Sequence, residues 1–105
     1  MTAISKEISQ SNFSELPTSE AVYAIFAADK SNTPINCRYV GETNNLSRRT
    51  GEHFDTNEEN ECLKEFMQSD KTKILVYELM INSDDKERLN AEKEWIAELV
   101  PICNK

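Results

Sequence analysis

Three side chains that could act together on a phosphate ester lie within one short stretch of the sequence. Tyr39 sits in an extended segment of aromatic and β-branched residues, and Arg49 and His53 follow in a segment that Asn44 or Asn45 could cap as a helix. Residues four apart share one helical face, so the guanidinium and the imidazole are expected to point the same way. A strand followed by a helix could therefore bring a phenol, a guanidinium and an imidazole together.

Two of these residues also have ordinary structural roles open to them. The planar fork of arginine suits a phosphate, but an exposed arginine can equally form a weak surface salt bridge. Arg48 fits the salt bridge better, because Glu52 lies four residues after it, and this leaves Arg49 for the phosphate. The unperturbed pKa of histidine lies near neutrality, so His53 could accept a proton from water, position that water, or simply be structural.

Glu92 stands out because its carboxylate falls on an apolar helical stripe. Leu89, Ile96 and Leu99 share that stripe, so the charge is predicted to be buried. A buried charge needs a partner or a metal ion. The residues alone leave two interpretations open: a carboxylate at the edge of the core that reaches water or pairs with Arg49, and a ligand for Mg²⁺ or Mn²⁺, which prefer carboxylate and water oxygens.

The segments that position these side chains begin with two strands. The apolar run over residues 22–28 predicts a central strand covered on both faces, paired with the Tyr39 strand as an antiparallel hairpin. Within the second strand, the period of two places Cys37, Tyr39 and Gly41 on one side. Gly41 is expected to end that strand, where a turn beside a substrate would benefit from a missing side chain.

The remaining elements are a short amphipathic turn or helix at the N-terminus, a second helix, a third strand and a final helix. Ile4 and Ile8 mark the N-terminal turn or helix, and the second helix is predicted to begin at a Thr56 cap and to end near Ser69. The third strand is predicted over residues 73–80. The final helix is predicted to be capped by Ser83 or Asp84 and to end before Pro101. The predicted fold class is α/β in the α+β sense, a small three-stranded antiparallel sheet flanked by helices.

In order and spacing, these residues resemble the GIY-YIG nuclease family, named after two tripeptides on neighbouring strands. The tripeptides here are Ala-Val-Tyr at 21–23 and Tyr-Val-Gly at 39–41. The family's arginine follows the second tyrosine by ten residues, which selects Arg49, and a histidine or tyrosine comes four residues later, which selects His53. A Leu-Pro lead-in and a closing acid, apolar, proline and asparagine pattern match Leu16, Pro17, Glu92, Ile96, Pro101 and Asn104.

The resemblance implies a divalent-metal-dependent endonuclease that hydrolyses DNA phosphodiester bonds by activated water, with one Mg²⁺ or Mn²⁺ ion. The implied catalytic residues are Tyr23, Tyr39, Arg49 and His53, the implied metal ligand is Glu92, and Gly41 and Asn104 support the site. One tyrosine would order or deprotonate the water, without an indication of which. Arg49 would stabilise charge on the scissile phosphate, and the implied substrates include branched or damaged DNA.

Two positions depart from the family pattern. Ala21 replaces a glycine, which is a mild change in ordinary β backbone, and Glu42 places a carboxylate where several members have a basic or neutral residue. A carboxylate beside a phosphate repels it unless a cation offsets the charge. The alternative function is therefore a catalytically inactive GIY-YIG-like domain that acts as a protein- or nucleic-acid-binding or regulatory module.

Charge and composition set further expectations for the 105 residues. The net charge is -7, and the whole excess lies in residues 52–105, which hold 14 acidic and 7 basic side chains. Such a domain should bind DNA weakly alone, so a protein partner could supply DNA affinity. An odd count of three cysteines without a Cys-x-x-Cys pair indicates no disulfide framework and favours the cytoplasm. No membrane segment is expected, and the organisation is an N-terminal segment, 1–15, and a domain, 16–105.

Overall fold

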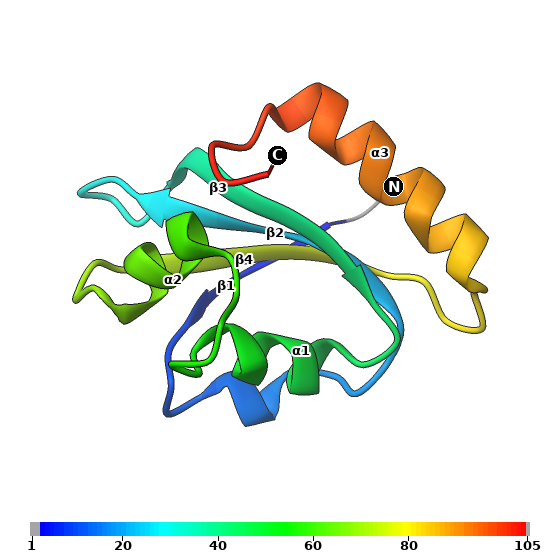
Figure 1. Ribbon diagram of the computed structural model, residues 1–105, viewed down its shortest axis with the longest axis horizontal. Helices are drawn as coiled ribbons and strands as arrows, with labels where there is room; N and C mark the ends of the chain where they lie inside the picture. Colours follow the sequence, from blue (N-terminus) through cyan, green and yellow to red (C-terminus); the bar gives the residue numbers. More distant parts are fainter. Residues whose placement is uncertain (1–2, 105) are drawn as a thin grey trace.

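The computed structural model describes residues 3–104 and contains one antiparallel sheet with helices on both faces (Figure 1). The elements follow one another as β1 (Ile4–Ile8), a 3-10 helix η1 (Phe13–Glu15), β2 (Ala21–Ala28), β3 (Pro34–Thr43), α1 (Leu46–His53), α2 (Glu61–Gln68), β4 (Lys73–Leu79) and α3 (Asp85–Leu99). The strand order is β1-β4-β2-β3, so β3, which carries Tyr39, lies at one edge of the sheet.

The central position predicted for β2 is confirmed. This strand pairs with β3 on one side and with β4 on the other, and its first five residues are buried. Alternate residues enter two separate cores: Tyr23 and Ile25 pack against α1 and α2, while Ala24 packs against α3. The apolar character of both alternating faces thus reflects helices on both sides of the strand.

The sheet has four strands, so the prediction of three is wrong. The segment predicted as an amphipathic turn or helix is β1, in which Ile4 pairs with Tyr77 and Ile8 with Lys73. Residues four apart share a face in a helix and also in a strand, because four is close to one helical turn and an even number. The spacing of the two isoleucines therefore fits both structures, and only pairing with β4 decides between them.

The face assignment within β3 is also corrected. Ile25 pairs with Tyr39 and Phe26 pairs with Cys37, so Arg38 is an extra residue in the ladder. Such a bulge shifts the alternation by one residue. Cys37 consequently joins the α3 core with Val40, while Tyr39 packs against the opposite core. Gly41 does not end the strand, which continues to Thr43.

The helix caps are partly as predicted. The side chain of Asn45 accepts the backbone N–H of Arg48 at the start of α1, and Asp84 forms a capping box with Glu87 at the start of α3. The second helix starts later than predicted. Its cap is Asn60, whose side chain accepts the N–H of Leu63, rather than Thr56, which lies in the preceding turn.

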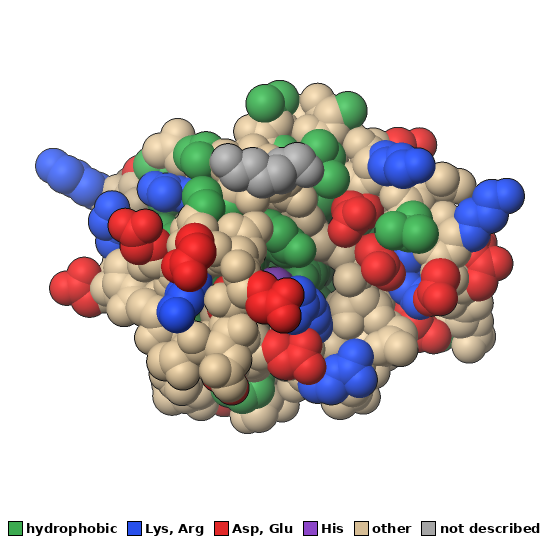
Figure 2. All heavy atoms as spheres, viewed as in Figure 1, with side chains coloured by type: hydrophobic (Ala, Val, Ile, Leu, Met, Phe, Trp, Pro, Cys, Tyr) green, Lys and Arg blue, Asp and Glu red, His purple; other side chains and the backbone are tan. Residues whose placement is uncertain are grey.

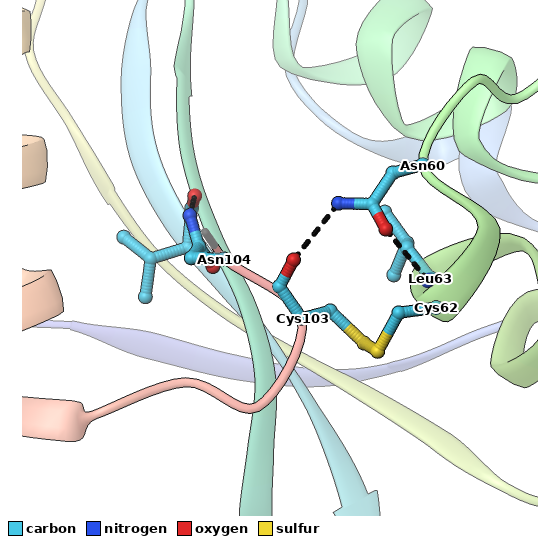
Figure 3. Close-up of a disulfide and its surroundings, with 6 residues drawn as sticks. Asn60, Cys62, Leu63, Cys103 and Asn104 are labelled. Atoms are coloured by element: carbon cyan, nitrogen blue, oxygen red, sulfur yellow. Dashed lines mark hydrogen bonds between the residues drawn. A yellow bond between two sulfur atoms is a disulfide. The ribbon is translucent and has the colours of Figure 1, made fainter.

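The last residues run beside the free edge of β3. The backbone N–H groups of Ile102 and Cys103 donate to the carbonyls of Cys37 and Arg38, at 3.0 and 2.7 Å. Figure 3 shows that Cys103 is also joined to Cys62 on α2 by a disulfide. The expectation of unpaired cysteines is therefore wrong for two of the three. The two cysteines are 41 residues apart and meet only because α2 and the C-terminal segment both approach β3 near Arg38.

Replacing Cys62 and Cys103 together by alanine should lower the free energy of unfolding by about 4 kcal/mol, the chain-entropy value for a cross-link spanning 41 residues. Urea titration of the oxidised proteins measures this loss. A reductant should bring the wild-type stability down to that of the double variant and leave the variant itself unchanged. A wild-type protein whose unfolding is insensitive to reductant would contradict the prediction.

No helix in the described part of the chain combines the length and apolar character that crossing a membrane requires. The N-terminal segment predicted over residues 1–15 contributes β1 and η1, and β1 is part of the sheet. The predicted outer bounds at residues 1 and 105 lie outside the described residues.

Candidate active site

An aromatic cluster forms where β2, β3 and α1 meet. The ring centroids of Tyr23 and His53 lie 5.7 Å apart, those of Tyr39 and His53 lie 5.2 Å apart, and those of the two tyrosines lie 6.3 Å apart. The phenol and imidazole that the sequence placed on a strand and a helix thus pack against each other. The second phenol comes from the neighbouring strand.

Gly41 makes room for this cluster. It pairs with Tyr23 across the β2 and β3 strands, and a Cβ atom on Gly41 would lie 2.6 Å from the Tyr23 hydroxyl oxygen. No real Cβ approaches an oxygen that closely, so a side chain here would displace the tyrosine ring. The glycine is needed for the close approach of a ring, and not for a turn as the sequence suggested.

Buried hydrogen bonds run from Tyr23 through His53 to a residue that the sequence did not single out. The Tyr23 hydroxyl lies 2.6 Å from His53 Nε2, and His53 Nδ1 lies 2.6 Å from Glu58 Oε1. Glu58 belongs to the loop between α1 and α2, where several acidic residues follow one another. Nothing in their types distinguishes Glu58 from its neighbours, and only the fold of the loop turns it toward His53.

The two phenols differ in access. Tyr23 is 1% exposed, whereas Tyr39 is only partly buried at the sheet edge. Burial raises the pKa of Tyr39, against the nearby positive charge of Arg49, and burial raises the pKa of Tyr23 well above its ordinary value. Both phenols therefore hold their protons at neutral pH. Of the two, Tyr39 is the one that a solvent molecule or substrate can reach.

Arg49 lies beside the phenols but is not left without a partner. Its Nη1 atom is 3.0 Å from Glu52 Oε1, and Arg48 Nε is 3.7 Å from the other oxygen of the same carboxylate. The predicted pair between Arg48 and Glu52 is present, but Glu52 bridges both arginines, so the expectation that Arg49 has no salt bridge is wrong. The guanidinium has donors on three nitrogens, and the Glu52 contact engages Nη1.

Glu92 lies on α3, which packs against Val40 of β3 on the face of the sheet opposite to the core that Tyr39 contacts. Its negative charge contributes to the raised pKa of both Tyr23 and Tyr39, which places the carboxylate within electrostatic range of both phenols. The side chain is partly buried, and its own pKa is raised by burial and then by the charge of Glu42. Within residues 3–104 it forms no salt bridge, which argues against the pair with Arg49.

The stripe that carries Glu92 differs from the predicted one. Leu89 is 45% exposed, and the buried residue on that turn is Arg88. Trp95, Ile96 and Leu99 continue the buried face toward the core around Val40. The stripe is therefore shifted by one residue at its first turn, which places a cation where an apolar side chain was expected.

Arg88 forms an ion pair with Glu42, the carboxylate that departs from the family pattern. Its Nε atom lies 3.0 Å from Glu42 Oε1, and its other nitrogens bind Ser83 and Asp85. The Glu42 carboxylate is thus held in an ion pair of which the arginine side chain is 5% exposed. The repulsion expected between Glu42 and a phosphate is reduced accordingly.

Asn104 clamps the backbone of β3 beside Tyr39. Its Oδ1 atom accepts the N–H of Val40 at 2.8 Å, and its Nδ2 atom donates to the carbonyl of Val40 at 2.9 Å. Val40 lies between the tyrosine and the glycine of the second tripeptide. The position of Asn104 next to the disulfide is visible in Figure 3.

The donor set around Tyr39 suits a hard cation. It offers one carboxylate, that of Glu92, together with phenol oxygens, and oxygen donors are the ligands that Mg²⁺ and Mn²⁺ prefer. In the described part of the chain, no group of three or more His, Cys, Asp or Glu side chains is arranged to hold a metal ion. An ion bound at Glu92 would therefore take most of its ligands from water and substrate.

The stability of the fold should fall as the pH drops below about 6.5, the unperturbed pKa of histidine. Burial lowers the pKa of His53 in the folded state, so as the pH falls the unfolded chain takes up this proton before the folded protein does. Protonation therefore stabilises the unfolded state relative to the folded state. His53 is the single histidine. Urea titrations at pH 7.5 and 5.5 should show a smaller pH effect for His53→Gln than for wild type, and equal effects would refute the assignment.

The GIY-YIG catalytic domain family matches residues 20–105. No curated protein matches the chain. The GIY-YIG N-terminal endonuclease domain of UvrC from Thermotoga maritima, bound to its catalytic divalent cation magnesium, is similar with a TM-score of 0.60 and 19% identity, over 91% of this chain and 94% of that one.

A second solved structure of the same Thermotoga maritima domain, a point mutant bound to its catalytic divalent cation, is similar to the same degree. Its TM-score is 0.60 with 18% identity, over 91% of this chain and 93% of that one. At these identities the two solved structures show a shared fold.

Proposed function

We propose a function from one premise: the chain belongs to the GIY-YIG family of catalytic domains. The proposed function is that of an endonuclease that hydrolyses DNA phosphodiester bonds by activated water and depends on Mg²⁺ or Mn²⁺. The observation that supports the proposal is that the charges of Arg49 on α1 and Glu92 on α3 both act on the phenol of Tyr39 on β3, so that three different elements contribute. A base, an anion-binding cation and a metal ligand are the parts such a reaction needs.

Each of these residues has a proposed role that follows from its chemistry. Tyr39 is the accessible phenol, so it orders the attacking water, and the minor fraction of it that is phenolate accepts the proton of that water. Arg49 stabilises the charge that develops on the scissile phosphate, using the donors that Glu52 does not engage. Glu92 would hold the divalent ion, which when bound supplies a Lewis acid for the phosphate and the leaving oxygen.

Three residues would keep this arrangement in place. Asn104 fixes the backbone between Tyr39 and Gly41, and the buried pair of Tyr23 and His53 supports the Tyr39 ring from behind. In the proposed mechanism, water attacks the phosphate directly, so no covalent intermediate with the protein is needed. A single carboxylate should bind Mg²⁺ weakly until DNA supplies further oxygen ligands.

Two observations favour the alternative of a non-catalytic binding module. Arg49 is already paired with Glu52, and the surface carries a net charge of -7. Figure 2 shows acidic and basic side chains interspersed on one face, without a continuous basic patch. Such a surface gives little attraction for phosphates, so a basic protein partner that supplies DNA affinity is part of the proposal.

A cleavage assay separates the two functions. The protein is incubated with supercoiled plasmid and with branched and damaged duplexes, in Mg²⁺, Mn²⁺ or EDTA. If the protein is an endonuclease, the DNA should be nicked or cut in Mg²⁺ or Mn²⁺ and left intact in EDTA. If no substrate is cleaved at protein concentrations where DNA binding is detected, the proposed endonuclease function is wrong and the binding module is favoured.

A further inference from the structure

The carboxylate of Glu58 is held from two sides next to the site. Its Oε1 atom lies 2.6 Å from His53 Nδ1, and its Oε2 atom accepts the backbone N–H of Asn60 at 3.0 Å. The side chain of Glu58 is 7% exposed and that of His53 is fully buried. A carboxylate that is this deeply buried and hydrogen-bonded through both oxygens is held in one orientation. It is not among the residues that act in the proposed reaction.

These contacts fix the direction of the hydrogen bonds. Although burial alone would raise it, the pKa of Glu58 is lowered by the hydrogen bonds from Asn60 and His53, so the carboxylate is ionised and can only accept. His53 is neutral because burial lowers its pKa, and its one ring proton must therefore lie on Nδ1. Nε2 is then an acceptor, and the Tyr23 hydroxyl donates to it.

We propose that Glu58 is a positioning residue that fixes His53 as the Nδ1–H tautomer and thereby holds the Tyr23 hydroxyl proton away from the catalytic edge. Without the carboxylate, the imidazole proton is free to move to Nε2, which is the form that predominates in water. The ring would then donate to the Tyr23 oxygen, and the hydroxyl proton would turn toward Tyr39. The consequence for catalysis rests on the proposed endonuclease function, whereas the tautomer does not.

The loop that carries Glu58 is anchored so that this orientation persists. Asn60 caps α2 through its Oδ1 atom and donates through Nδ2 to the carbonyl of Cys103 at 2.9 Å (Figure 3). The disulfide between Cys62 and Cys103 joins the same two segments. Glu58 is thus connected to the C-terminal segment that clamps β3 through Asn104. The carboxylate, the imidazole and the Tyr39 strand are held by one set of contacts.

Ring ¹⁵N spectra of His53 test the tautomer directly, because this is the single histidine of the chain. Wild type should show a protonated Nδ1 and an unprotonated Nε2. Glu58→Ala should move the proton mainly to Nε2, and Glu58→Gln should reduce the Nδ1–H population, since one amide oxygen cannot replace two carboxylate oxygens toward two donors. The exposed neighbour provides a charge-matched control, and Glu59→Gln should leave the spectrum unchanged.

An Nε2–H tautomer in wild type would overturn the proposal, and so would an Nδ1–H tautomer that persists in both Glu58 variants. In the cleavage assay, Glu58→Ala should lower kcat by about 10- to 100-fold with little change in KM, by analogy with the loss seen when a carboxylate that orients a metal-bound histidine is removed. Equal kcat for wild type and Glu58→Ala would refute the positioning role. A wild-type protein that cuts no DNA would instead count against the endonuclease, because the spectra need no DNA.

Discussion

Replacing Arg49 by alanine should slow phosphodiester cleavage by about 100- to 1,000-fold, the loss typical of removing one donor that stabilises a developing negative charge. Arg49 stands beside both phenols, and its positive charge also lowers the pKa of Tyr23 and of Tyr39 against the effect of their burial. Its removal would therefore weaken the phosphate contact and make the phenols weaker participants in proton transfer.

Arg48 is a matched control for this substitution because it is the adjacent residue, carries the same charge and shares the Glu52 carboxylate. Its own side chain is 56% exposed and also contacts Asn44. Single-turnover rates with saturating protein should show a large loss for Arg49→Ala and almost none for Arg48→Ala. Similar losses in the two variants would mean that the arginines contribute only general attraction to DNA.

Replacing Tyr39 by phenylalanine should lower the single-turnover rate by about 100- to 10,000-fold, the range for loss of a general base. The variant keeps the ring that packs against His53 and removes only the hydroxyl. Tyr77→Phe is the control, since Tyr77 is the third tyrosine, is buried in the same core and lies on β4, where it pairs with Tyr23 and is separated from the Tyr39 strand by β2. It should cleave at nearly the wild-type rate.

The pH profile separates a catalytic phenol from a packing one. Because burial raises the pKa of Tyr39, the phenolate is a minor species at neutral pH, and its fraction grows about tenfold per pH unit below that pKa. The wild-type rate should therefore rise from pH 6 to pH 9, and the residual rate of Tyr39→Phe should not. A variant that keeps both the rate and the pH dependence, with Tyr23→Phe inactive, would assign the proton transfer to Tyr23.

Local signals in the sequence were sufficient for most of the elements that carry the site. The apolar run of β2 and the caps of α1 and α3 are all decided by neighbouring residues, and each cap is found at one of the two positions predicted for it, Asn45 and Asp84. The errors arise where pairing partners decide the outcome. β1 needs β4 to become a strand, and the bulge at Arg38 that turns Cys37 to the α3 core depends on the register of β3 against β2.

The same distinction applies to the site. Tyr39, Arg49 and His53 are close in sequence, so the spacing within a strand and a helix predicts that they meet. The partners that complete their environment come from elsewhere: Glu58 from a loop, Arg88 from α3 against Glu42, and the disulfide from α2 and the C-terminal segment. The ion pairs of Glu58 and Arg88 follow no sequence periodicity, because a long side chain can reach a partner from many positions. They could therefore not be predicted from one sequence.

The central claim is that DNA cleavage depends on a divalent ion held by Glu92. The most direct measurement compares the cleavage rates of wild type, Glu92→Gln and Glu94→Gln at matched concentrations of DNA and of Mg²⁺ or Mn²⁺. Glu94 is an exposed carboxylate on the same helix, so it controls for loss of one negative charge. The account predicts metal-dependent cleavage by wild type and Glu94→Gln, and a rate for Glu92→Gln no higher than that of wild type in EDTA. Wild-type cleavage by Glu92→Gln at the same metal concentration would contradict it.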